Sequence, residues 1–195
     1  ALVEKKERLI SHLHCQGGLE NSPMLFDYDG PRDCRAALAA QNSPKACDYG
    51  CIGFGTCAEA CPFDAIVMGP GDLPVVIAEK CTACGICVKV CPRDLYELLP
   101  ESTEVWLGCS SQGRGKAVKE VCKVGCIACR KCVKVDPQDA ISMEGNLPVL
   151  DYAKGSTFRE AAEACPMSCF VVREESLAVS PGHAPATGEE SQETE

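Results

Sequence analysis

The stretch CDYGCIGFGTCAEACPFDAI, residues 47–66, and the tighter stretch CTACGICVKVCPRDL, residues 81–95, decide the fold of this chain. Each stretch carries four cysteines, and in each the last cysteine is followed by proline. The whole sequence has 17 cysteines in 195 residues, and only 5% of its residues are aromatic. Because this composition is poorly suited to one large apolar core, we expect groups bound by the cysteines to hold the fold together.

The spacing of these cysteines indicates cluster ligands and argues against a disulfide scaffold. Sulfurs this close in sequence seldom bridge with relaxed geometry, and an odd total leaves one thiol over. The Cys-x2-Cys-x2-Cys-x3-Cys-Pro run that begins at Cys81 is the signature of bacterial ferredoxins, which bind 4Fe–4S clusters. Gly85 allows the loop to turn sharply around such a cluster. A zinc ribbon is the alternative, but it needs neither the third close cysteine nor the proline.

Crossed ligation predicts how the first eight cysteines are shared between two clusters. In a two-cluster ferredoxin the first three cysteines of a run hold one cluster, and the fourth ligates the other. One predicted set is Cys47, Cys51, Cys57 and Cys91; the other is Cys81, Cys84, Cys87 and Cys61. The wider spacings in the first run enlarge one loop only, so we expect the two clusters to differ in reduction potential.

An internal repeat defines a third cluster. Residues 62–81 have a near copy in residues 137–155, and each copy predicts two short strands around a turn that contains glycine. The predicted third ligand set is Cys126, Cys129, Cys132 and Cys165, which brings the total to three 4Fe–4S clusters.

The same repeat predicts that the second module has lost its other cluster. Gly155, Phe158 and Ala161 stand where the three corner cysteines would be, and Phe158 and Ala162 are expected to fill the space. Asp136 stands at the position of the crossing cysteine. Because the cluster that it would ligate is absent, Asp136 is expected to be an ordinary surface carboxylate.

These patterns predict an α+β fold made of tandem bacterial-ferredoxin-like modules, with small strands and helices around the clusters. The expected divisions are an N-terminal segment (1–45), a two-cluster module (46–100), a degenerate one-cluster module (101–172) and a disordered acidic tail (173–195). Short helices are expected at residues 34–41 and 157–165.

Five cysteines have no place in these sets: Cys15, Cys34, Cys109, Cys122 and Cys169. They are expected to be small buried thiols. Three alternatives stay open: a redox-sensitive pair of Cys109 and Cys122, Cys169 as a substitute ligand, and a metal site made by Cys15 with His12 and His14.

Charge and the missing motifs narrow the function. The formal net charge of −9 argues against nucleic-acid binding and favours basic protein partners. The sequence has no apolar run long enough to span a bilayer and no secretory signal. We find no nucleophile–base pair and no phosphate-binding or dinucleotide fingerprint, so this chain alone carries no catalytic residues. The chemistry it can do is single-electron transfer.

The order of four motifs resembles one family. The motifs HCQGG (14–18), YDGPRDCRAA (28–37), KACDYGCIGFGTCAEACPFDAI (45–66) and VCKVGCIACRKCVKV (121–135) resemble the B subunit of the Rnf (or Rsx) electron-transport complex, in its long form. Members of that family begin with a membrane-anchoring helix and a small iron–sulfur domain. The resemblance therefore implies that the chain is a fragment lacking both.

The resemblance also implies a role and a place. This chain would relay electrons between soluble ferredoxin, or the flavin-bearing NADH-linked subunit, and membrane subunits of an ion-translocating complex. It would lie at the cytoplasmic side of the bacterial inner membrane, as a soluble fragment whose membrane association depends on the missing segment. Two other classes stay open: the electron-input segment of a soluble oxidoreductase, and a zinc-stabilised interaction module.

Overall fold

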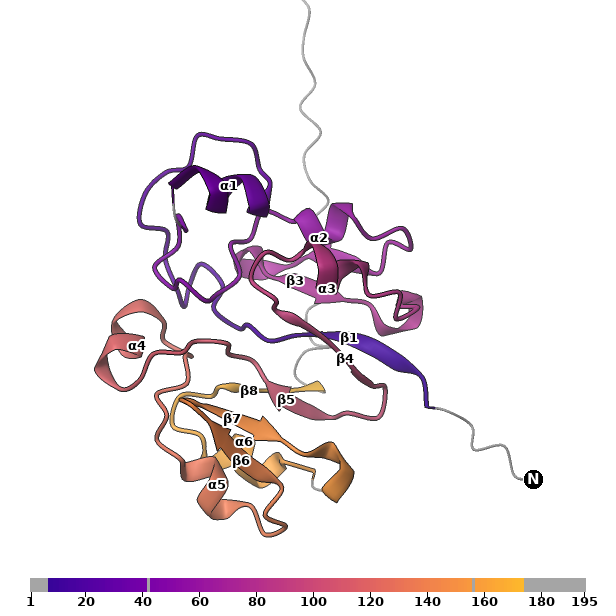
Figure 1. Cartoon of the computed structure of the whole chain (residues 1–195), viewed down its shortest axis with the longest axis vertical. Coiled ribbons are helices and arrows are strands. Elements are labelled where there is room, and N and C mark those ends of the chain that lie inside the picture. Colours follow the sequence, from indigo (N-terminus) through magenta and orange to yellow (C-terminus); the bar gives the residue numbers. More distant parts are fainter. Residues whose placement is uncertain (1–6, 42, 156, 174–195) are drawn as a thin grey trace, which may run out of the picture.

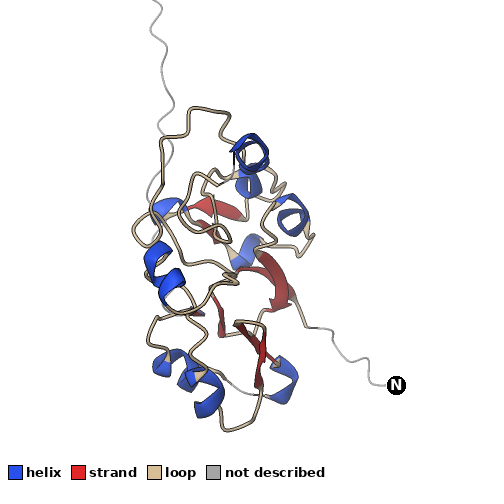
Figure 2. Cartoon of the chain, turned by 60° about the vertical axis from the view of Figure 1, so that its left-hand side comes forward, coloured by secondary structure: helices blue, strands red, loops and turns tan. Residues whose placement is uncertain are grey.

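The computed structural model describes residues 7–41, 43–155 and 157–173. Two modules lie one above the other in Figure 1, and each contains two small two-stranded antiparallel sheets. Figure 2 shows the strands in the middle of the molecule, with short helices around them and loops making up much of the rest. The predicted α+β class is confirmed. No helix in this described part of the chain is long and apolar enough to cross a membrane.

The first module carries the N-terminal strand and both of the cysteine runs that end in Cys-Pro. Its strands pair as β1 with β4 and β2 with β3. The elements are β1 (Leu9–Leu13), α1 (Cys34–Gln41), α2 (Thr56–Glu59), β2 (Ile66–Met68), a 3-10 turn (Pro70–Asp72), β3 (Pro74–Val76), a second 3-10 turn (Ala78–Lys80), α3 (Ile86–Val90) and β4 (Tyr96–Pro100).

The second module repeats this plan, and its first and last strands again pair with each other. Here β5 pairs with β8, and β6 pairs with β7. The elements are β5 (Val105–Leu107), α4 (Lys116–Val121), α5 (Lys131–Val135), β6 (Ile141–Glu144), β7 (Leu147–Leu150), a 3-10 turn (Tyr152–Lys154), α6 (Arg159–Ala164) and β8 (Phe170–Val172). The predicted strand pair in each copy of the repeat is thus confirmed, as are the helices at α1 and α6. Of the predicted tail, Arg173 is the one residue that the structure describes; residues 174–195 lie outside the described part of the chain.

Phe158 fills the centre of the second module. Its side chain is 3% exposed and meets the Tyr152 ring edge-on, with 5.4 Å between ring centres. Ala161 and Phe170 belong to the same core, and the partly buried Ala162 packs against it. Phe158 and Ala162 thus both pack in the core of the second module.

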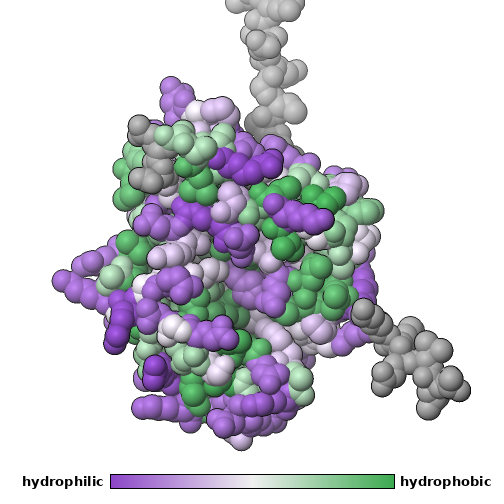
Figure 3. Space-filling model, viewed as in Figure 1, coloured by the Kyte–Doolittle hydropathy of each residue, from purple (hydrophilic) through white to green (hydrophobic). Residues whose placement is uncertain are grey.

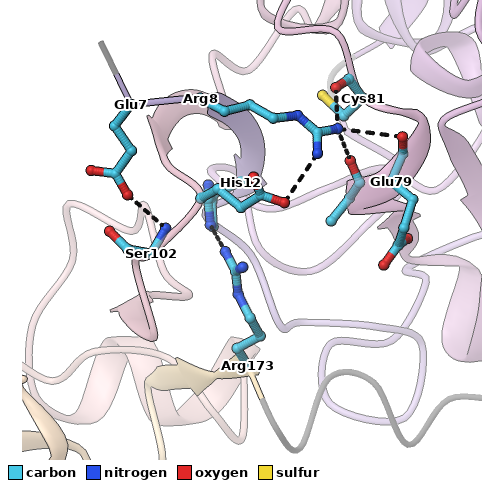
Figure 4. Close-up of polar contacts among 9 residues, drawn as sticks. Glu7, Arg8, His12, Glu79, Cys81, Ser102 and Arg173 are labelled. Atoms are coloured by element: carbon cyan, nitrogen blue, oxygen red, sulfur yellow. Dashed lines mark hydrogen bonds and ion pairs between the residues drawn. The ribbon is translucent and has the colours of Figure 1, made fainter. Parts of the chain in front are cut away.

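Strand β1 connects the modules, which the division at residue 45 did not anticipate. Trp106, in β5, donates a hydrogen bond to the Leu13 carbonyl (3.0 Å), and its ring lies edge-on to His12. Figure 4 shows His12 facing Arg173 just after β8, with 3.2 Å between nitrogens. At the start of β1, the Arg8 guanidinium donates to the backbone carbonyl of Cys81 (3.0 Å). The strand therefore contacts both modules along its length.

Asp136 is more than the ordinary surface carboxylate that the sequence predicted. Its carboxylate accepts hydrogen bonds from the backbone amides of Ala140 and of Ile141, the latter at 2.8 Å. At the equivalent place in the first module, Cys61 Sγ accepts from the amide of Ala65, also four residues further on (3.4 Å). Asp136 thus takes over the acceptor role of a crossing cysteine and holds the turn into β6.

We expect Asp136→Ala to lower the free energy of unfolding by about 1–3 kcal/mol, because partly buried amides lose their acceptor. Asp136→Asn keeps one acceptor oxygen and is the matched control, and it should recover most of the loss. Thermal unfolding of the two variants beside the unaltered chain measures the effect. Equal midpoints for Asp136→Ala and the unaltered chain would contradict this role.

Candidate metal centres

Four cysteines of the first module surround a hollow of about 380 Å³, which we call hollow 1. They are Cys34, Cys51, Cys57 and Cys91. Three of these side chains are buried and Cys91 is half-buried. Apolar side chains, among them Leu13 and Met68, line most of the remainder, together with Thr56 and Arg93. The hollow is therefore a mostly apolar site with four sulfur donors.

Helix α1 carries Cys34 into hollow 1. Asp33 caps this helix by accepting from the backbone amides of Arg35 (2.9 Å) and Ala36 (2.8 Å), which makes Cys34 the first helical residue. The Cys34 amide donates to the hydroxyl of Thr56 (2.7 Å), at the start of α2. These contacts place a cysteine that the sequence left unassigned beside Cys57.

Cys47, which the spacing assigned to this set, does not line hollow 1. The backbone just before it is held by a hydrogen bond from the Ala46 amide to the Pro23 carbonyl (2.9 Å). Cys47 lies beside Cys15 instead: a β-carbon added at Gly50 would be 3.5 Å from Cys47 Sγ and 3.7 Å from Cys15 Sγ. The four cysteines around hollow 1 thus differ at one position from the ligand set that the spacing predicted.

The other set of the first module comes together as the spacing predicted. Hollow 2, of about 330 Å³, is lined by Cys61, Cys81, Cys84 and Cys87. Helix α3 begins after Gly85, whose φ of 72° is a left-handed conformation that glycine adopts without strain. The crossing of Cys61 and Cys91 between the two hollows thus follows the ferredoxin pattern.

Hollow 3, of about 350 Å³, gathers the cysteines of the second module. It is lined by Cys126, Cys129, Cys132 and Cys165, with Cys169 beside them. The buried Cys169 thiol donates to the sulfurs of Cys126 and Cys165, and this contact lowers the pKa of Cys126 to about 7 and of Cys165 to about 6. The same contacts raise the pKa of Cys169 itself, because they favour its protonated, donating form.

The histidines near Cys15 have other partners. His12 Nδ1 lies 3.2 Å from the Ile10 carbonyl and its Nε2 faces Arg173, while His14 lies 2.7 Å from the Leu107 carbonyl and 3.1 Å from Glu97. In the described part of the chain, no three His, Cys, Asp or Glu side chains gather closely enough for one bare metal ion. The structure therefore does not assemble the histidine site that the sequence left open.

Comparison with known proteins supports iron–sulfur clusters in the first module. The 4Fe-4S dicluster domain family matches residues 46–98. The chain is 46% identical over 161 residues to the B subunit of the Na(+)-translocating ferredoxin:NAD(+) oxidoreductase complex of Acetobacterium woodii, and the match covers 83% of this chain and 48% of that protein. The chain belongs to the family of Rnf B subunits.

Two further Rnf relatives give the same result. Identity is 45% over 163 residues to the B subunit of the proton-translocating ferredoxin:NAD(+) oxidoreductase complex of Clostridium ljungdahlii, covering 84% of this chain and 57% of that protein. Identity is 39% over 171 residues to the B subunit of an ion-translocating oxidoreductase complex of Methanosarcina acetivorans, and this match covers 88% of this chain and 65% of that protein. The chain spans about half to two thirds of the length of these curated relatives.

Two hydroxyl groups reach sulfurs in this Rnf module. Tyr96 donates to Cys57 Sγ in hollow 1 (3.2 Å), and Ser11 Oγ lies 3.1 Å from Cys87 Sγ in hollow 2. Both residues lie on the paired strands β4 and β1, which therefore set the polar surroundings of both hollows. Burial raises the pKa of Cys57 to about 11, because a thiolate is poorly solvated there.

The hollows differ in their access to solvent. Cys84 in hollow 2 and Cys129 in hollow 3 are exposed, whereas the cysteines around hollow 1 are buried or half-buried. Phe63 is 44% exposed and lines hollow 2. In Figure 3 apolar side chains gather over the region of α2 and α3, while polar side chains cover much of the second module. A partner can therefore contact a cysteine side chain directly at hollows 2 and 3.

Proposed function

We propose that this Rnf B-subunit segment relays electrons and holds one 4Fe–4S cluster in each of its three hollows. The proposed ligand sets are Cys34, Cys51, Cys57 and Cys91; Cys61, Cys81, Cys84 and Cys87; and Cys126, Cys129, Cys132 and Cys165. The observation that carries the proposal is the recurrence, three times in one chain, of four cysteines around a hollow of similar size. Cys34 takes the place that spacing gave to Cys47.

The chemistry of the donors fits such clusters. Burial raises the pKa of Cys57 and of Cys132 to about 11, so these thiols keep their protons until a metal displaces them. Bound 4Fe–4S clusters supply one-electron redox chemistry at potentials that depend on hydrogen bonds to sulfur and on solvent exposure. The chain contributes these factors through Tyr96, Ser11 and the buried walls of hollow 1.

The exposed cysteines favour docking near two separate places on the surface. A partner seated beside Cys84 meets hollow 2 in the first module, and one beside Cys129 meets hollow 3 in the second. We propose soluble ferredoxin and the flavin-bearing, NADH-linked subunit as these partners, together with other subunits of the complex at the cytoplasmic face of the membrane. The exposed Phe63 ring gives the first of these surfaces an apolar contact.

The test is electron transfer from the reduced chain to the flavin-bearing subunit, followed by stopped flow under anaerobic conditions. We expect flavin reduction that slows as salt is added, because a chain with a formal net charge of −9 is attracted to a basic docking surface. The metal-free chain is the control. A colourless chain that binds zinc, or a cluster-loaded chain that cannot reduce the flavin, would refute the proposal.

The two hydroxyl contacts allow the clusters to be tuned separately. Tyr96→Phe should lower the potential in hollow 1, and Ser11→Ala the potential in hollow 2, because the more negative reduced state loses a hydrogen bond to sulfur. The shift should be on the order of tens of millivolts, since about 59 mV is a tenfold change for one electron. Redox titration followed by EPR measures it. Equal shifts of every signal in both variants would contradict this assignment.

A further inference from the structure

Four cysteines outside the three hollows come from segments that meet between the two modules. They are Cys15, Cys47, Cys109 and Cys122, all of them buried. Backbone hydrogen bonds join these segments: the Gln16 amide donates to the Gly108 carbonyl (3.0 Å), and the Lys123 amide donates to the Asn21 carbonyl (2.9 Å). The fold thus brings together residues far apart in the sequence.

Two glycines face the sulfurs of this group. A β-carbon at Gly17 would lie 3.3 Å from Cys122 Sγ and 3.6 Å from Cys15 Sγ. The corresponding point at Gly50 lies 3.5 Å from Cys47 Sγ and 3.7 Å from Cys15 Sγ. A side chain at either position would contact two sulfurs. Cys15 therefore lies beside both Cys47 and Cys122.

Three of these four sulfurs receive the same backbone contact as sulfurs around hollows 1 and 3. The amides of Gly17, Ser111 and Val124 donate to the sulfurs of the cysteines two residues before them, Cys15, Cys109 and Cys122. This contact between a sulfur and the amide two residues on is also made at Cys51, Cys91, Cys126 and Cys165. Such amide donors stabilise thiolate ligands of a cluster.

A buried lysine lies beside two of these cysteines and beside Cys51 of hollow 1. Lys45 is 0% exposed, and its ammonium donates to the carbonyls of Gly17 (2.5 Å) and Cys51 (2.9 Å). It also interacts electrostatically with the sulfurs of Cys15 and Cys122. Within the described ranges no carboxylate pairs with it. A fully buried lysine needs a compensating negative charge, which thiolates around an oxidised cluster supply.

The group touches a proposed ligand on either side. The Cys51 amide donates to Cys15 Sγ (3.3 Å), and Cys51 itself lines hollow 1. The Cys126 amide donates to Cys109 Sγ (3.2 Å), and Cys126 lines hollow 3. The group therefore lies between hollow 1 of the first module and hollow 3 of the second.

We propose that Cys15, Cys47, Cys109 and Cys122 hold a fourth 4Fe–4S cluster, which joins the redox sites of the two modules. With this assignment, every cysteine of the chain except Cys169 belongs to a group of four. The proposal goes beyond the three-cluster function above and can fail separately from it.

Native mass spectrometry of the anaerobically prepared chain counts clusters directly, even when loading is incomplete. We expect the heaviest species of the unaltered chain to carry four clusters, and that of Cys122→Ala to carry three. Adding Cys15→Ala to Cys122→Ala should remove no further cluster, because both cysteines belong to one site. Adding Cys57→Ala to Cys122→Ala should leave two clusters, because Cys57 belongs to a different site, hollow 1.

Other outcomes overturn the inference. An unaltered chain with three clusters at most, or a Cys122→Ala variant that keeps the full number, would show that this group holds none. A mass that fits one zinc ion, or a disulfide between Cys109 and Cys122, would assign the group to other chemistry. If Cys122→Ala does not fold, the count for the unaltered chain still decides between three and four. Clusters in the three hollows alone would leave the proposed function intact.

Discussion

Cys34→Ala is expected to remove one 4Fe–4S cluster from the chain, although Cys34 lies outside every cysteine run. The reason is geometric: α1 places this residue in hollow 1 with Cys51, Cys57 and Cys91. A site that loses one of four thiolates leaves an open vertex, and we expect it to lose the cluster or to keep a damaged one. Native mass spectrometry and EPR of the reduced chain would record the loss.

A double variant makes this prediction specific to hollow 1. Cys34→Ala combined with Cys57→Ala should lose no more than Cys57→Ala alone, because both residues would serve the same cluster. Cys47→Ala is the matched comparison, since the spacing placed Cys47 in this site. If Cys47→Ala abolishes the hollow 1 signal while Cys34→Ala leaves it unchanged, the spacing is right and our assignment from the fold is wrong.

Phe158→Ala is expected to lower the free energy of unfolding by about 3–5 kcal/mol, as for other buried aromatic residues cut back to alanine. The side chain is 3% exposed and packs in the core that contains Cys126 and Cys132. Loss of its ring leaves a cavity beside hollow 3, so the second module should lose its cluster at a lower temperature than the first. Thermal unfolding, followed by the visible absorbance and by circular dichroism, measures both effects.

Phe26→Ala is the control for this prediction. Phe26 is 43% exposed, and its removal should change stability by less than about 0.5 kcal/mol. If Phe158→Ala and Phe26→Ala unfold at the same temperature, Phe158 does not fill a space that the module needs.

Sequence patterns predicted the strand pairs whose two strands are neighbours in the sequence. The strand pair β2 and β3 and its copy β6 and β7 follow from short runs around a turn, where neighbours in sequence are neighbours in space. Strand β1 was missed because its partner, β4, lies far along the chain. No pattern within five residues reveals such pairing.

The same limit applies to the candidate site. Spacing brought together the cysteines of hollows 2 and 3, because most of each set lies in one short run. It missed Cys34, which reaches hollow 1 only through α1 and its contact with Thr56. The sequence did give one signal for further ligands: five cysteines stayed unassigned, and all of them were expected to be buried. Which of these cysteines lie close together in space could be seen only from the fold.

The pairing of β1 with β4 has a consequence for biosynthesis. The register joins Leu9 to Pro100 and Leu13 to Tyr96, so β1 leaves the ribosome well before its partner and must wait for it. Closing so large a loop costs little extra free energy but slows folding, because distant residues must meet. All the cysteines of hollows 1 and 2 precede β4 in the sequence. We therefore expect metal loading to begin while the nascent module is still open, with β1 closing over it afterwards.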